Sequence, residues 1–93
     1  MDKVIAQKLR EKELEILKAR SYQSLCELIG KPLSRIAVGP DGKDYNVEIQ
    51  VFWDEKPSGN VRVIVNVDDG GWRAFFPKSD SFIMSPNSEI VGD

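Results

Sequence analysis

Apolar side chains between positions 2 and 29 recur at the spacing of an α-helix. This stretch contains no glycine or proline and is rich in Leu, Glu, Lys, Arg, Gln and Ala, all of which favour helix. At about 3.6 residues per turn, one narrow sector of the helix surface holds Ile5, Leu9, Ile16 and Ala19. Ala6 and Leu17 flank this sector, and Lys12 interrupts it. The sector predicts an amphipathic helix that packs against another layer of the fold.

A second apolar stripe follows Ser21 and consists of Tyr22, Leu25, Cys26 and Ile29. On one straight helix it would be rotated by roughly a quarter turn from the first stripe. Ser21 can accept a hydrogen bond from an unpaired backbone N–H as an N-cap, so we expect a kink or a new helix there. Gly30, followed by Lys31 and Pro32, predicts the end of the helical segment.

Beyond the helical segment the apolar residues alternate with a period of two, which is typical of strands with one buried face. Strands are predicted over 33–38, 45–53 and 61–68, separated by turn residues at 39–42 and by a loop over 54–60. The apolar series of the third strand is Val61, Val63, Val65 and Val67.

The Asp69-Gly70 dipeptide predicts a two-residue hairpin turn, and Gly71 to Phe76 would form the fourth strand, which Pro77 ends. On the valine face, this register pairs Val67 with Trp72, Val65 with Ala74 and Val63 with Phe76. On the opposite face, it pairs Asn66 with Arg73 and Ile64 with Phe75.

These patterns predict an α+β fold in one domain over 1–93, because 93 residues are too few for two ordinary cores. A helical segment at 1–30, kinked or split into two helices, would cover the valine face of a three- to four-stranded antiparallel meander at 33–77. The odd length of the loop at 54–60 keeps Val51 on that face. Residues 78–93 are expected to form an extended tail or a short edge strand.

Composition narrows the class of protein and the chemistry open to it. The chain is 41% hydrophobic and 30% charged, contains no apolar run near the ~20 residues of a membrane span, and starts without an apolar signal segment, so we expect a cytoplasmic protein with no membrane contact. It has no histidine and one cysteine, Cys26, which excludes histidine-dependent catalysis and the usual zinc sites. We therefore expect no metal and no cofactor, and favour a protein without enzymatic activity.

Charge is distributed unevenly along the chain. Residues 1–35 hold eight Lys and Arg against five Asp and Glu, whereas residues 36–93 hold five against ten. The aromatic-rich half is therefore acidic and would repel phosphate, so no nucleic-acid partner is expected.

The predicted hairpin tip, made of Asp68, Asp69, Gly70, Gly71 and Trp72, is one candidate site. Adjacent carboxylates can bind a hard divalent cation or share acid–base work, and Asp54 is a further carboxylate for such a site. Turn preference explains the same residues, and neighbouring side chains of a strand point to opposite faces. We favour the turn interpretation.

The second candidate is an apolar patch of Phe52, Ile64 and Phe75 on the face opposite the valines, with Arg62 and Arg73 beside it. An exposed apolar patch with a polar rim is typical of a surface that binds a partner. Alternatively, the segment 82–84 could fold back over the patch and make it part of the core. Periodicity alone does not decide between these alternatives.

Several segments together resemble a small bacterial domain family of unknown function. They are Tyr45–Asp54, Asn60–Val63, Asp68–Phe75 and Asp80–Met84, and the hallmark is Asp-Asp-Gly-Gly-Trp-Arg-Ala-Phe. The likeness covers about residues 44–93. The hairpin that ends in Gly-Gly-Trp also resembles, more loosely, small bacterial immunity proteins, which bind and block a cognate toxin. The resemblance implies a bacterial cytoplasmic protein and transfers no catalytic residue.

We therefore predict a non-enzymatic protein-binding module that is a monomer or a weak homodimer. An immunity-like protein is one form that such a module takes. The predicted binding residues are Phe52, Arg62, Ile64, Arg73 and Phe75. The alternative is a carboxylate-based enzyme or a divalent-metal-binding domain centred on Asp68 and Asp69.

Overall fold

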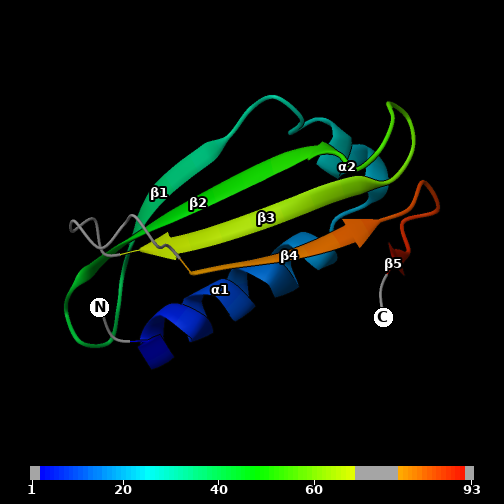
Figure 1. Ribbon diagram of the computed structural model, residues 1–93. Helices are drawn as coiled ribbons and strands as arrows, with labels where there is room; N and C mark the ends of the chain where they lie inside the picture. Colours follow the sequence, from blue (N-terminus) through cyan, green and yellow to red (C-terminus); the bar gives the residue numbers. More distant parts are fainter. Residues whose placement is uncertain (1–2, 69–77, 92–93) are drawn as a thin grey trace.

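The computed structural model describes residues 3–68 and 78–91. Along the chain its elements are α1 (Lys3–Lys18), α2 (Tyr22–Cys26), β1 (Leu33–Val38), β2 (Asp44–Trp53), β3 (Val61–Asp68), β4 (Lys78–Met84) and β5 (Ile90–Val91). The strands form one antiparallel five-stranded sheet in the order β1-β2-β3-β4-β5, and the helices lie against one of its faces (Figure 1). The α+β prediction is confirmed, with more strands than the three or four predicted.

The helical segment divides where the sequence predicts a new start. Helix α1 ends at Lys18, and Ser21 is the N-cap of α2, with its hydroxyl accepting a hydrogen bond from the backbone N–H of Ser24 at 3.1 Å. Helix α2 ends at Cys26, earlier than the predicted end at Gly30, and Gly30 takes a φ of +76°, a left-handed conformation that favours glycine.

The buried face of α1 differs from the predicted stripe. Its buried residues are Ala6, Arg10, Glu13 and Leu17, whereas Ile16 is 52% exposed. Burial of two charged side chains is possible because Arg10 pairs with Asp80 of β4 and Glu13 pairs with Arg35 of β1. The helix is therefore rotated toward ion pairs that a hydrophobic pattern does not reveal.

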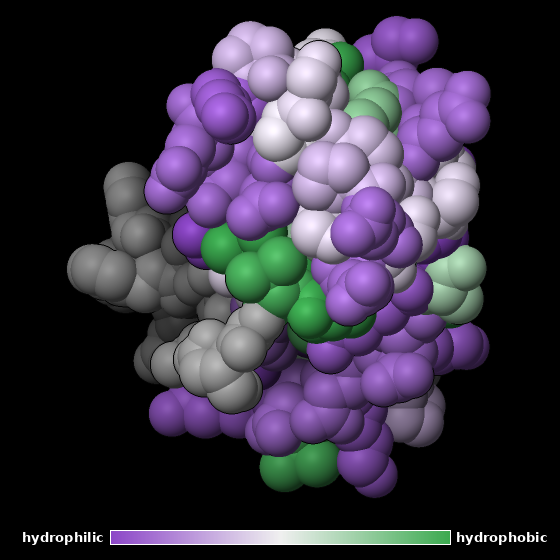
Figure 2. Space-filling view, turned by 90° about the vertical axis from the view of Figure 1, so that its right-hand side faces the viewer, coloured by the Kyte–Doolittle hydropathy of each residue, from purple (hydrophilic) through white to green (hydrophobic). Residues whose placement is uncertain are grey.

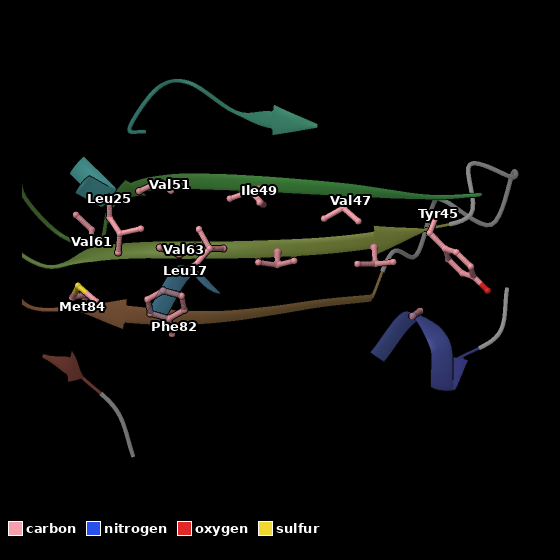
Figure 3. Packing of buried hydrophobic residues seen from close by; sticks show 13 residues of the cluster. Leu17, Leu25, Tyr45, Val47, Ile49, Val51, Val61, Val63, Phe82 and Met84 are labelled. Carbon is pink, nitrogen blue, oxygen red and sulfur yellow. The ribbon is translucent and has the colours of Figure 1, made fainter. Parts of the chain in front are cut away.

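We call the face covered by the helices the inner face. Val47, Ile49 and Val51 of β2 lie there opposite Val67, Val65 and Val63 of β3, so the prediction that Val51 shares the valine face is confirmed. All the β3 valines are fully buried, and Figure 3 shows their neighbours Leu17, Leu25, Phe82 and Met84 in the same cluster. The core thus fills the space between the helices and the sheet.

The predicted partner of β3 is wrong. Val63 lies opposite Phe82 and Val61 opposite Met84 in β4, where the hairpin register places Phe76 opposite Val63. The predicted turn and the strand 71–76 lie outside the described residues. Alternation favours 71–76, because 78–84 has apolar residues opposite the valines only at Phe82 and Met84 and sets Asp80 opposite Val65.

The segment 78–93, predicted as a tail or short edge strand, supplies β4 and β5 to the sheet. Phe82 and Met84 point to the inner face, so they do not cover the opposite face. Within the described residues, no helix is long and apolar enough to span a membrane.

Candidate protein-interaction surface

The face of the sheet opposite the helices is formed by the alternate residues of each strand, and we call it the outer face. Near one end, one row crosses the sheet: Phe52 lies opposite Arg62, Arg62 opposite Ile83, and Ile83 opposite Val91. Ile64 lies on the same face, one pleat farther along β3. We call these residues, Phe52, Arg62, Ile64, Ile83 and Val91, the outer cluster.

The outer cluster is apolar except for Arg62 and is accessible to solvent. Phe52 is 39% exposed and Val91 is 41% exposed, while Ile64 and Ile83 are half-buried. Figure 2, which views the end of the molecule where β5 lies, shows hydrophobic surface surrounded by hydrophilic atoms. An exposed apolar group with a polar surround is the usual composition of a protein-binding surface.

Arg62 is held in place within the outer cluster by Asp54. Its Nε and Nη2 atoms both lie 2.9 Å from Asp54 Oδ1. Asp54 follows β2 directly, and its backbone N–H donates to the carbonyl of Asn60 at 2.9 Å, which closes the loop between β2 and β3. The ion pair therefore fixes the guanidinium and balances its charge at the same time.

The charged residues on the rest of the described outer face are carboxylates, which lie among polar side chains and the apolar Ile36 and Val38 of β1. Asp44 and Glu48 of β2 are exposed, and Asp68 at the end of β3 is buried and accepts a hydrogen bond from Asn46 Nδ2 at 3.2 Å. Because Asp54 balances Arg62, the described part of this face is acidic. A surface of this charge favours a partner with basic groups around its apolar contact.

The structure brings together three of the predicted binding residues, namely Phe52, Arg62 and Ile64. Arg73 and Phe75 lie outside the described residues. The predicted opposition of Ile64 and Phe75 is wrong, since Ile64 lies opposite Ser81.

Sequence reasoning missed Ile83 and Val91, which complete the outer cluster. The signal for Ile83 was present, because Phe82, Ile83 and Met84 alternate in direction once 78–84 is treated as a strand. Val91 has no comparable signal, since β5 contains only two residues.

The carboxylates considered for catalysis or metal binding do not converge in the described part of the chain. Asp54 pairs with Arg62 near the start of β3, whereas Asp68 ends that strand, so the two lie roughly 20 Å apart at the rise of a strand. Of the hairpin tip, Asp69, Gly70, Gly71 and Trp72 lie outside the described residues. Residues 3–68 and 78–91 contain no group of three or more His, Cys, Asp or Glu residues placed to hold a metal.

Comparisons of this chain with protein-family models, with curated proteins and with solved structures find no match. Its function is therefore inferred from the arrangement of its own residues.

Proposed function

We propose that the protein is a non-enzymatic binding module that recognises a protein partner through the outer cluster. The observation that carries this proposal is the accessible row of Phe52, Arg62, Ile83 and Val91 on a face that the helices leave uncovered. Aromatic and arginine side chains supply much of the affinity at protein interfaces, and this row contains both types.

The geometry supports binding at low entropic cost. The sheet holds Phe52, Ile64 and Ile83 by backbone pairing, and the Asp54 ion pair orders Arg62 before any partner arrives. Side chains that are already ordered lose less conformational entropy on binding. The outer cluster is therefore suited to receive an apolar anchor from a partner.

Charge defines the chemistry of the partner. Asp44 and Glu48 are exposed on the same face, so basic side chains around the apolar anchor would be attracted and acidic partners repelled. Blocking a basic toxin in a bacterial cytoplasm, as the resemblance to immunity proteins implies, is one role of this kind.

The test has to locate binding on the surface as well as detect it. A protein captured with this chain is produced separately and titrated into the isotope-labelled chain while amide chemical shifts are recorded. We expect the largest shifts in β2, β3 and β4 around Phe52, Arg62 and Ile83. Shifts confined to α1 would contradict the proposal.

A matched pair of variants sharpens the test. Phe52→Ser should weaken binding at least about tenfold, because it removes an exposed aromatic anchor. Ile16→Ser removes an apolar side chain that is also exposed but lies on α1, and it should leave the affinity unchanged. Equal losses for both variants would show that the effect is not specific to the outer cluster.

A further inference from the structure

We propose that the chain forms a symmetric homodimer through β1, with the strands of two copies pairing antiparallel and the two-fold axis passing beside Ile36. Two sheets would then join edge to edge. This proposal is independent of the proposed function, because β1 contributes no residue to the outer cluster.

Strand β1 is an unprotected edge. Within the described residues it pairs only with β2, in an uninterrupted register from Leu33 to Val38. It contains no proline, and its one charged residue, Arg35, pairs with Glu13 on the inner side. Ile36 is 63% and Val38 68% exposed. Natural edge strands usually carry a free charge, a bulge or a proline that discourages such pairing, whereas the one charge of β1 is neutralised by Glu13.

The hairpin between β1 and β2 shows which backbone groups face outward. The N–H of Gly39 donates to the carbonyl of Lys43 at 2.9 Å, so this pair bonds across the hairpin. Antiparallel ladders alternate bonded and non-bonded pairs, which directs Ala37 and Arg35 toward β2. The N–H and C=O groups of Ser34, Ile36 and Val38 therefore point to the open edge. These are the groups that a second strand would bind.

The positions of two prolines select one register for a symmetric pair. With Ile36 opposite its own copy, Ser34 lies opposite Val38 of the second copy, and every outward N–H and C=O from 34 to 38 gains a partner. Centring the pair on Arg35 instead would set Val38 opposite Pro32. Centring it on Ala37 would set Ser34 opposite Pro40. Proline has no N–H to donate, so both alternatives lose hydrogen bonds.

Side chains favour the same register. Centring on Arg35 would also set two guanidinium groups opposite each other, whereas centring on Ile36 sets Arg35 opposite the small Ala37 of the second copy. On the outer face, Ile36 and Val38 of both copies would form one apolar contact from side chains that are exposed in the single chain. This register therefore avoids like-charge contact and places the exposed apolar side chains together.

The edge is open to a partner on the inner side as well. Helix α1 contacts β3 and β4, and a groove of about 310 Å³ lies between it and β1, with Leu17, Leu33 and Val47 in its lining. Figure 1 shows β1 at one margin of the sheet, away from the helix beneath β3 and β4. Pairing one short strand from each copy buries less surface than the about 1,200 Å² typical of stable complexes. We therefore expect a weak dimer.

Disulfide trapping tests the register directly. In a Cys26→Ser background, Ile36→Cys should yield covalent dimers on mild oxidation, because residues opposite each other in a bonded pair have Cα atoms about 5.5 Å apart. Val38→Cys is the matched control. Its two copies would be separated by four residues along the strands, roughly 14 Å, which is too far for a disulfide.

Sedimentation of the unmodified full chain from micromolar to millimolar concentration provides the second measurement. We expect reversible dimers, and Ile36→Lys should weaken them at least about tenfold by placing like charges at the axis. Ile16→Lys, which adds the same charge on α1, should not change them. If Ile36→Lys fails to fold, the cysteine pair decides alone.

Three results would overturn the proposal. They are a chain that remains monomeric at millimolar concentration, dimers that form equally with Val38→Cys and Ile36→Cys, and a captured partner protein that shifts the β1 amides instead of a second copy. The first two results leave the outer-cluster proposal unaffected, whereas the third would also contradict it.

Discussion

The two faces of the same sheet are built from alternate residues of the same strands, yet they serve different purposes. In β3, Val61, Val63 and Val65 are fully buried on the inner face, while Arg62 and Ile64 between them keep partial contact with solvent. The inner face excludes water and stabilises the fold. The outer face has apolar and charged groups, and neither helix of the described chain covers it. Neighbouring residues can therefore be changed to test the stability of the fold and the proposed recognition separately.

Met84 and Ile83 provide the strongest test of this difference, because they are adjacent in β4 and face opposite ways. Met84 is 1% exposed in the core, so Met84→Ala should lower the free energy of unfolding by about 2–5 kcal/mol. Ile83→Ala should cost about 1 kcal/mol, since Ile83 is half-buried before the change. Chemical denaturation measures both. Equal losses would mean that the two faces contribute alike to stability.

The ion pair between Arg10 and Asp80 is an exception to the apolar character of the inner side. Arg10 Nε lies 3.0 Å from Asp80 Oδ2, and the Arg10 side chain is only 10% exposed. Asp80→Ala should destabilise the fold by about 1–3 kcal/mol, because a buried cation loses its partner. Adding Arg10→Met should recover much of that loss in thermal unfolding. A double variant as unstable as Asp80→Ala would show that Arg10 stabilises by packing and not through its charge.

On the outer face, breaking an ion pair should affect stability little and binding more. Asp54→Asn should cost about 0.2–1 kcal/mol of stability, since both partners retain contact with solvent. It should also weaken capture of the partner, because Arg62 is no longer held in the outer cluster. Calorimetric titration and thermal unfolding compare the two effects. Unchanged affinity would show that ordering Arg62 does not matter for recognition.

The smallest effect concerns Tyr45, the inner-face residue that reaches the rim of the sheet. Desolvation alone would raise the pKa of Asp41, but hydrogen bonds from the Tyr45 hydroxyl, at 2.8 Å, and from backbone N–H groups, together with the charge of Lys43, hold that pKa below its ordinary value. A lowered pKa in the folded state stabilises the protein above the ordinary value of the carboxyl, and the contribution is lost as pH falls through the lowered pKa.

Tyr45→Phe should therefore reduce the loss of stability on acidification. Melting temperatures recorded from about pH 6 down to about pH 2 measure this dependence. Asp41→Asn should reduce the same dependence by removing the carboxyl itself. An acid transition that neither variant alters would place its cause elsewhere in the protein.

The elements that could be predicted from the sequence are those set by local interactions. The new helix at Ser21 and the first three strands follow from a cap and a period of two. The shared face of Val51 and Val63 follows from the length of one loop. Each of these depends on residues close together in the chain.

The errors concern contacts between distant residues. The alternating apolar residues of 71–76 favour that segment, yet β3 pairs with 78–84, where Asp80 lies opposite Val65. The buried face of α1 depends on ion pairs whose partners are 70 and 22 residues away from Arg10 and Glu13. No hydrophobic pattern within the helix contains that information.

For the candidate site, the sequence was sufficient to predict the residues that β2 and β3 contribute, because a short loop sets the register of these two strands. Phe52, Arg62 and Ile64 were expected to share a surface, and they do. Ile83 and Val91 come from strands whose pairing was not predicted, so they were missed. Three of the five residues of the outer cluster can therefore be found by alternation alone, and the other two require the order of the strands.

The side chains of Arg10 and Glu13 leave α1 one turn apart and reach strands on opposite sides of the sheet, β4 and β1. The helix consequently links these two strands across the inner face. Any shear or flattening that moves β1 away from β4 has to lengthen at least one of the two ion pairs. Both ion pairs thus oppose a separation of β1 from β4 from the helical side, while a partner on the opposite side would meet neither of them.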